Sequence, residues 1–203
     1  MLLDNQTFNM TEMAKTSPTY NHPSDSTVNI DTQGRADRRY SITIDFEEPV
    51  NQRVLVILKN PSKATKTISD KTVSNVTSYF THHRQSKFRD CQGLEILNIF
   101  PHYETDSGKL IELGDLVDEQ NHRIIDEKIA NHETIILAYG DHPSGLKELF
   151  DQEVLRLLNT LEGKRVYIMK KLSNNGNPTH GQVWSNDYNL LSATIQEGEI
   201  KIR

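Results

Sequence analysis

The run Val54-Leu55-Val56-Ile57-Leu58, followed directly by Lys59-Asn60-Pro61-Ser62, decides the fold class. Five consecutive apolar residues leave no polar face, which is typical of a central strand that is buried on both sides of a sheet. Such strands occur in parallel sheets whose two faces are covered by helices. The run stops at Lys59-Asn60-Pro61-Ser62.

Three further apolar runs, at residues 94–100, 134–139 and 165–169, have the same character. Between them, apolar residues recur with helical spacing after a cap at Ser69 or Asp70, over residues 118–131 and over residues 146–161. Residues 40–46 alternate as a half-buried strand does, and short strands are expected after residue 178. We therefore predict an α/β three-layer sandwich: a mainly parallel central sheet of about four core strands, with helices on both faces.

The first 36 residues differ from the rest, being rich in Asn, Thr, Ser, Asp and Pro with few apolar residues. This composition predicts a disordered polar arm over residues 1–36, followed by a single α/β domain over residues 37–203. Val28 and Ile30 allow a short edge strand within the arm.

The composition argues against several classes of site. The single cysteine, Cys91, excludes an intrachain disulfide and zinc sites built on cysteine pairs. Its place near the start of a strand indicates a packing or surface thiol rather than a nucleophile. The eight histidines lack metal-ligand spacing, and neither a Gly-x-Gly-x-x-Gly nor a Walker-type motif is present, so we expect no metal and no cofactor.

Charge and hydropathy bear on partners and location. The net charge is −5 and no long basic run is visible, which lowers the expectation of nucleic-acid binding without removing it. No apolar run is long enough to cross a bilayer, and the N-terminus lacks a signal-peptide core. We expect a cytoplasmic protein with no membrane partner.

A site is expected where the parallel strands end, because ligands bind at the carboxyl ends of such sheets. Four segments should converge there: Asn60-Pro61-Ser62, Asn98-Ile99-Phe100-Pro101, Tyr139-Gly140-Asp141-His142 and the loop containing His180. Their amides, hydroxyl, imidazole and carboxylate suit a polar heterocycle or a phosphate, and a weakly activated water. Taken singly, each has an ordinary structural explanation, such as an Asx turn or a surface histidine.

The motifs between about Arg39 and Trp184 resemble the domain of unknown function family 1643, which is found in bacteria and phages. The resemblance is carried by Arg39-Tyr40, Leu58-Lys59-Asn60-Pro61-Ser62-Lys63-Ala64, Asp70-Lys71-Thr72-Val73, Gly93-Leu94, Asn98-Ile99-Phe100, Asn121, Ala138-Tyr139-Gly140 and Leu172-Ser173-Asn174-Asn175-Gly176-Asn177-Pro178-Thr179-His180. The chain departs from the family pattern at Thr65, Tyr139 and Gly181, where an acidic residue, Trp and Pro are usual.

The motif order is also similar, more distantly, to the uracil-DNA glycosylase superfamily. Leu58-Lys59-Asn60-Pro61-Ser62 stands where mismatch-specific glycosylases carry Gly-Ile-Asn-Pro-Gly, and the loop with His180 stands where they carry a His- or Asn-Pro-Ser loop. His142-Pro143-Ser144 spells the latter loop but follows the third core strand and precedes a helix. We therefore expect Ser144 to cap that helix and His180 to belong to the site.

This distant resemblance implies a glycosylase-like hydrolase, or a binder, that acts on a nucleobase, a nucleotide or a nucleic acid. In it Asn60 orients water, His180 stabilises the leaving base, and Asp70 either caps its helix or acts as a general base. The residues expected to contact substrate are Pro61, Ser62, Asn98, Phe100, Tyr139 and Gly140. The alternatives are a non-catalytic module that binds a nucleotide-like molecule, for instance in phage–host conflict, and a structural adaptor, which would not need polar groups at strand ends.

Overall fold

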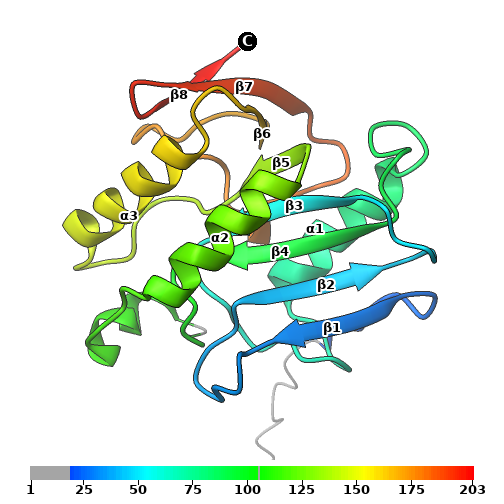
Figure 1. The fold of residues 1–203 in the computed structure, drawn as a ribbon, viewed down its shortest axis with the longest axis horizontal. Coiled ribbons are helices and arrows are strands. Elements are labelled where there is room, and N and C mark those ends of the chain that lie inside the picture. The colour runs from blue at the N-terminus through cyan, green and yellow to red at the C-terminus, as the bar shows by residue number, and fades with distance from the viewer. Residues whose placement is uncertain (1–18, 105) are drawn as a thin grey trace, which may run out of the picture.

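A computed structural model describes residues 19–104 and 106–203. Within these residues, eight strands form one sheet against which three α-helices lie (Figure 1). The elements in chain order are β1 Thr27–Asp31, β2 Ser41–Asp45, β3 Arg53–Leu58, α1 Lys71–His83, β4 Gly93–Asn98, the 3-10 helix η1 Ser107–Leu113, α2 Glu119–Asn131, β5 Thr134–Leu137, α3 Lys147–Thr160, β6 Arg165–Met169, the 3-10 helix η2 Gly181–Val183, β7 Leu190–Gln196 and β8 Glu199–Ile202. No helix in this described part is both long and apolar enough to cross a membrane.

The centre of the sheet is parallel and both of its flanks are antiparallel. The strand order is β1-β2-β4-β3-β5-β6-β7-β8. The four predicted core strands pair in parallel as β4-β3-β5-β6. The pairings β1–β2, β2–β4, β6–β7 and β7–β8 are antiparallel. The prediction of a mainly parallel sheet of about four strands is therefore corrected to a mixed sheet in which antiparallel pairings predominate.

The two faces of the sheet carry separate hydrophobic clusters because the side chains of β3 alternate between them. Val54, Val56 and Leu58 pack on one face with α1, whereas Leu55 and Ile57 pack on the other with α2 and α3. Figure 1 shows α2 in front of the sheet and α1 behind it. All five residues of the β3 run are essentially inaccessible to solvent, as the sequence predicts for a strand buried on both faces.

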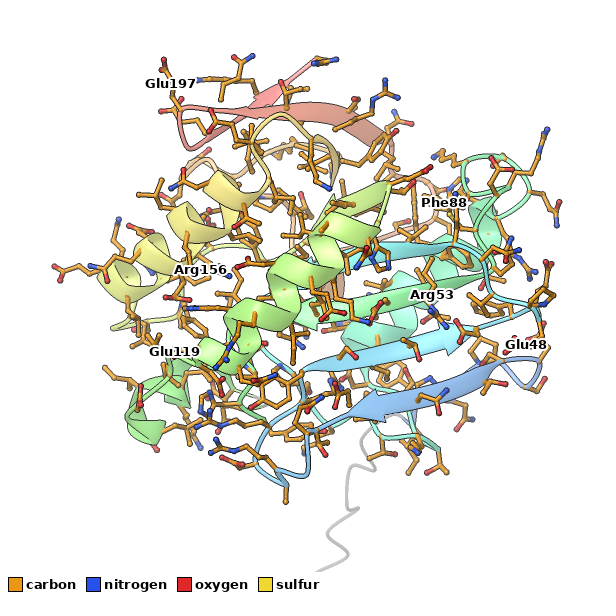
Figure 2. The ribbon with its side chains drawn as sticks, viewed as in Figure 1. Glu48, Arg53, Phe88, Glu119, Arg156 and Glu197 are labelled. Atoms are coloured by element: carbon orange, nitrogen blue, oxygen red, sulfur yellow. The ribbon has the colours of Figure 1, made fainter. Side chains whose placement is uncertain are left out.

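On the face covered by α2 and α3, the two helices are also joined by a polar contact. Arg156, labelled on α3 in Figure 2, donates from Nη1 to Oδ1 of Asp126 on α2 over 2.9 Å.

The helix starts follow local chemistry, with one exception. Asp70 caps α1 through the N–H of Val73, and Asp118 caps α2 through the N–H of Asn121. In contrast, α3 begins after Leu146 with no side-chain cap, so the expectation that Ser144 caps this helix is wrong. Gly145 has a φ of +75° and reverses the chain between Ser144 and the first helical turn, which removes the hydroxyl from capping position.

The predicted arm of residues 1–36 lies only partly within the described residues. Residues 1–18 are outside them. Residues 27–31 form β1, the edge strand that Val28 and Ile30 allowed, and all five pair with β2. Val28 and Ile30 pack against the cluster under α1, so apolar contact accompanies the hydrogen bonding of this strand.

Candidate functional site

A cavity of about 660 Å³ lies where β3 ends and α1 begins. Its walls come from five segments that are far apart in the sequence. The lining residues are Thr19, Tyr20, Lys59, Asn60, Ser62, Lys63, residues 68–72, Glu104, His180 and Gln182. The volume falls within the range of roughly 300–1,000 Å³ that small-molecule sites occupy.

Asn60 lies two residues beyond the end of the central strand β3 and lines the cavity. Its Nδ2 donates to the backbone oxygen of Glu104 over 2.5 Å and to that of Pro61 over 3.1 Å. These bonds consume both amide protons and fix the orientation of the side chain. The amide oxygen Oδ1 is thereby left as the hydrogen-bond acceptor that Asn60 can offer to a ligand or a water.

His180 precedes η2, and its ring is held in one tautomer. Nδ1 accepts a hydrogen bond from the backbone N–H of Gln182 over 3.1 Å, so the proton of the neutral ring resides on Nε2. Burial, aided by the nearby Lys59 ammonium, lowers the pKa of His180 to about 4. At neutral pH, His180 therefore presents a neutral ring with a donor at Nε2.

The backbone of Gly140 lies directly against the His180 side chain. It has a φ of +69°, in the left-handed region, and a Cβ at this position would lie 2.8 Å from Cβ of His180. The N–H of Gly181 also donates to the backbone oxygen of Ala138 over 3.1 Å. The loop containing His180 is thus held directly against the end of β5.

Asp70 has both of its oxygens occupied by backbone donors. Oδ1 accepts from the N–H of Val73 over 2.8 Å, and Oδ2 accepts from the N–H of Ala64 over 3.2 Å. Arg39, buried at 1% exposure, donates to the backbone oxygen of the same Ala64 over 3.2 Å. Asp70 and Arg39 together hold the wall between β3 and α1 in place.

Lys59 continues β3 beyond Leu58 and is also buried, with 9% of its surface exposed. Its ammonium nitrogen lies 6.0 Å from the centroid of the Phe150 ring and forms no ion pair with any described residue. Burial lowers the pKa of Lys59, an effect that the more distant Asp141 opposes.

The structure gathers part of the predicted site into this cavity. Asn60, Ser62, Asp70 and His180 line it together. Pro61, Asn98, Phe100 and Gly140 are not among its lining residues; Asn98 and Phe100 are fully buried. Tyr139, likewise fully buried, lines a different cavity of about 510 Å³ together with His142.

Ten lining residues were not predicted as site residues: Thr19, Tyr20, Lys59, Lys63, Ile68, Ser69, Lys71, Thr72, Glu104 and Gln182. Tyr20 reaches the cavity through a bridge in which the N–H of Ser69 donates to its backbone oxygen over 3.0 Å. Its place in a polar N-terminal segment gave no indication of this. Lys59 could have been predicted from the sequence. It directly extends a buried strand, and a buried charge needs a hydrogen-bond partner, a counter-charge or contact with solvent.

Among the described residues no group of three or more His, Cys, Asp or Glu side chains is arranged to hold a metal ion. The cavity offers the chemistry of its amides, its hydroxyl groups, its imidazole, its lysines and its two carboxylates.

Comparison with known proteins gives a family. No curated protein and no solved structure matches the chain. A family model described as "Protein of unknown function (DUF1643)" matches residues 39–181, a range that contains Asn60, Asp70 and His180. Since this range covers well over half of the sequence, the chain belongs to the DUF1643 family.

Proposed function

We propose that the cavity binds a nucleobase-containing ligand and hydrolyses the N-glycosidic bond between the base and its sugar. The observation that carries this proposal is that Asn60, whose Oδ1 is an acceptor, and neutral His180, whose Nε2–H is a donor, line the same cavity. An acceptor suits the attacking water, and a donor suits an oxygen or nitrogen of the departing base.

In this reaction the oxygen of a water bonds to C1′ of the sugar while the C1′–N bond breaks, and the base leaves with the electron pair of that bond. Oδ1 of Asn60 accepts a hydrogen bond from the water and orients it. Nε2–H of His180 donates to the base and stabilises its developing negative charge. The proton lost by the water ends on the released base or in solvent.

The weak basicity of Asn60 is compatible with this chemistry. Glycosidic bonds cleave through a transition state in which the sugar carries positive charge, so that departure of the base, rather than deprotonation of water, dominates the barrier. Orientation of water and stabilisation of a leaving group each contribute factors of roughly 10²–10⁴ in rate.

One observation favours a second function, in which the cavity binds a nucleotide-like molecule without cleaving it. Both carboxylates of the cavity are engaged by backbone N–H groups: Asp70 by Val73 and Ala64, and Glu104 by Asp106, whose N–H donates to Oε1 over 2.8 Å. Neither is left entirely free as a general base, which suits a binding module.

The test compares wild type with Asn60→Ala, His180→Ala and the control His142→Ala. Nucleosides, mononucleotides and single- and double-stranded DNA with normal or modified bases are assayed for released base by chromatography and for binding by thermal shift. A saturating ligand at 100 times its Kd stabilises by roughly 2.7 kcal/mol, which is readily measured.

Release of a base that both cavity variants abolish and His142→Ala spares supports the hydrolase. Binding without release, sensitive to the same two variants, favours the binding module. Absence of both binding and release across all these compounds overturns the proposal, and damage by His142→Ala alone would move the site to the other cavity.

A further inference from the structure

We infer that the cavity takes a ligand with a terminal phosphate, and that the ammonium group of Lys59 is the internal anchor of this phosphate. The inference deepens the proposed function, on which it rests for the base-bearing part of the ligand. It specifies a free mononucleotide as the substrate class.

The first step is the state of Lys59 itself. Nine-tenths of this residue is removed from solvent, yet its ammonium group has no hydrogen-bond or ion-pair partner among the described residues. The ammonium nitrogen is not one of the fully buried side-chain atoms that lack a partner in the described residues, so it keeps access to solvent and an anion in the cavity can reach it. The Phe150 ring, 6.0 Å away, lies at the outer limit of a cation–π contact and leaves the ammonium free to bind such an anion.

The second step is the charge around Lys59. Lys63 and Lys71 line the same cavity, and the first turn of α1, a helix of 13 residues, supplies the positive end of a helix dipole there. Against these stand the carboxylates of Asp70 and Glu104. His180 is neutral at physiological pH and adds no charge. The cavity therefore has an excess of positive charge in a chain whose net charge is −5.

The third step is the kind of anion. A phosphate monoester carries up to two negative charges and ends the molecule, so it fits a lysine that lies inside a cavity. An internal phosphodiester of a nucleic acid would have to continue in two directions past the same buried group. Because the overall negative charge also disfavours a polyanion, the observations support a mononucleotide.

The experiment measures the affinity of a nucleoside and of its 5′-monophosphate by calorimetry, with inorganic phosphate as a competitor and a short single-stranded oligonucleotide as a third ligand. The variants are Lys59→Met and the control Lys109→Met, which removes the same charge from an exposed residue outside the cavity lining. Circular dichroism checks that both variants fold.

For wild type and Lys109→Met we expect the monophosphate to bind at least tenfold more tightly than the nucleoside, and inorganic phosphate to compete. In Lys59→Met this tenfold advantage should disappear while nucleoside affinity changes less than threefold. The comparison in wild type does not depend on any variant, so a folding defect in Lys59→Met would leave the inference testable.

Equal affinities of nucleoside and monophosphate in wild type, or an undiminished advantage in Lys59→Met, would overturn the phosphate anchor and leave the proposed function standing. Binding of inorganic phosphate that depends on Lys59, with no binding of nucleoside or nucleotide, would support the anchor and reject the proposed function. An oligonucleotide that binds more tightly than the monophosphate would overturn the assignment to a mononucleotide.

Discussion

The side-chain nitrogen of Asn60 and the backbone oxygen of Glu104 lie 2.5 Å apart, and this contact joins the end of the central strand to the segment that follows β4. It orients the amide so that its oxygen is the acceptor left for a ligand. Two substitutions at Asn60 therefore separate the contact with Glu104 from the role of the amide oxygen.

Asn60→Ala should reduce base release or ligand affinity at least 100-fold while the protein stays folded, because a part-buried amide at a strand end contributes little to the core. Asn60→Asp keeps an acceptor but places a carboxylate oxygen against the backbone oxygen of Glu104. The repulsion between these two oxygens should lower the thermal stability of the variant. Steady-state kinetics or calorimetry, together with melting curves, tests both. An Asn60→Ala protein within threefold of wild type would refute the assigned role.

His180 should make the protein less stable in mild acid. Its ordinary pKa of 6.5 applies in the unfolded chain, whereas the folded protein lowers it to about 4. Between these two pH values, His180 is protonated in the unfolded state but neutral in the folded state, so the free energy of unfolding falls as pH decreases from 6.5 towards 4. The full loss amounts to roughly 3 kcal/mol.

Urea unfolding at pH 7.5 and pH 4.5 tests this prediction. His180→Gln cannot titrate, so its loss of stability between the two pH values should be smaller than that of wild type. His142→Gln should retain the wild-type loss. Identical losses in wild type and His180→Gln would show that His180 is not buried in the neutral form.

Gly140 should tolerate no side chain, for two separable reasons. Its φ of +69° costs an L-residue roughly 1–2 kcal/mol, and the new Cβ would meet Cβ of His180 at 2.8 Å. Gly163 has a similar φ of +77° but nothing within 4 Å of the built Cβ. Gly163→Ala should therefore show the backbone cost alone, whereas Gly140→Ala should lose more stability and also ligand binding. Equal effects of the two variants on melting and binding would contradict the described contact.

The edge strand β1 should stabilise the domain, although it lies within the segment whose composition predicts a disordered arm. A truncation that begins at residue 37 loses the whole ladder with β2 and the contacts of Val28 and Ile30, while one that begins at residue 27 keeps them. The shorter protein should melt several degrees lower. If the two truncations melt together, β1 contributes nothing to stability.

The parallel centre of the sheet could be predicted because burial on both faces leaves a continuous apolar run, as in residues 54–58. The antiparallel flanks could not, because an alternating strand such as β2 records which face is buried but not which neighbour it pairs with or in which direction. β2 pairs with β4 rather than with β3, the strand that follows it in the sequence. A local sequence pattern does not predict such a long-range pairing.

The site was predictable where polar residues leave a strand towards open space, as Asn60 does. It was not predictable where a strand-end residue faces the interior, as Asn98 and Phe100 do, because one residue of register separates the two outcomes. The order of the strands distinguished His180 from His142, and the structure places them in different cavities.

The distances in sequence between the walls of the cavity have a consequence for its biosynthesis. A ribosome that adds roughly 5–20 residues per second needs on the order of ten seconds to progress from Asn60 to His180. During that interval the central strand can exist without the imidazole of His180, which lines the same cavity as Asn60. A ligand that contacts both residues can therefore stabilise the nascent protein only after His180 has been synthesised, and a chain that stops before His180 lacks one wall of the cavity.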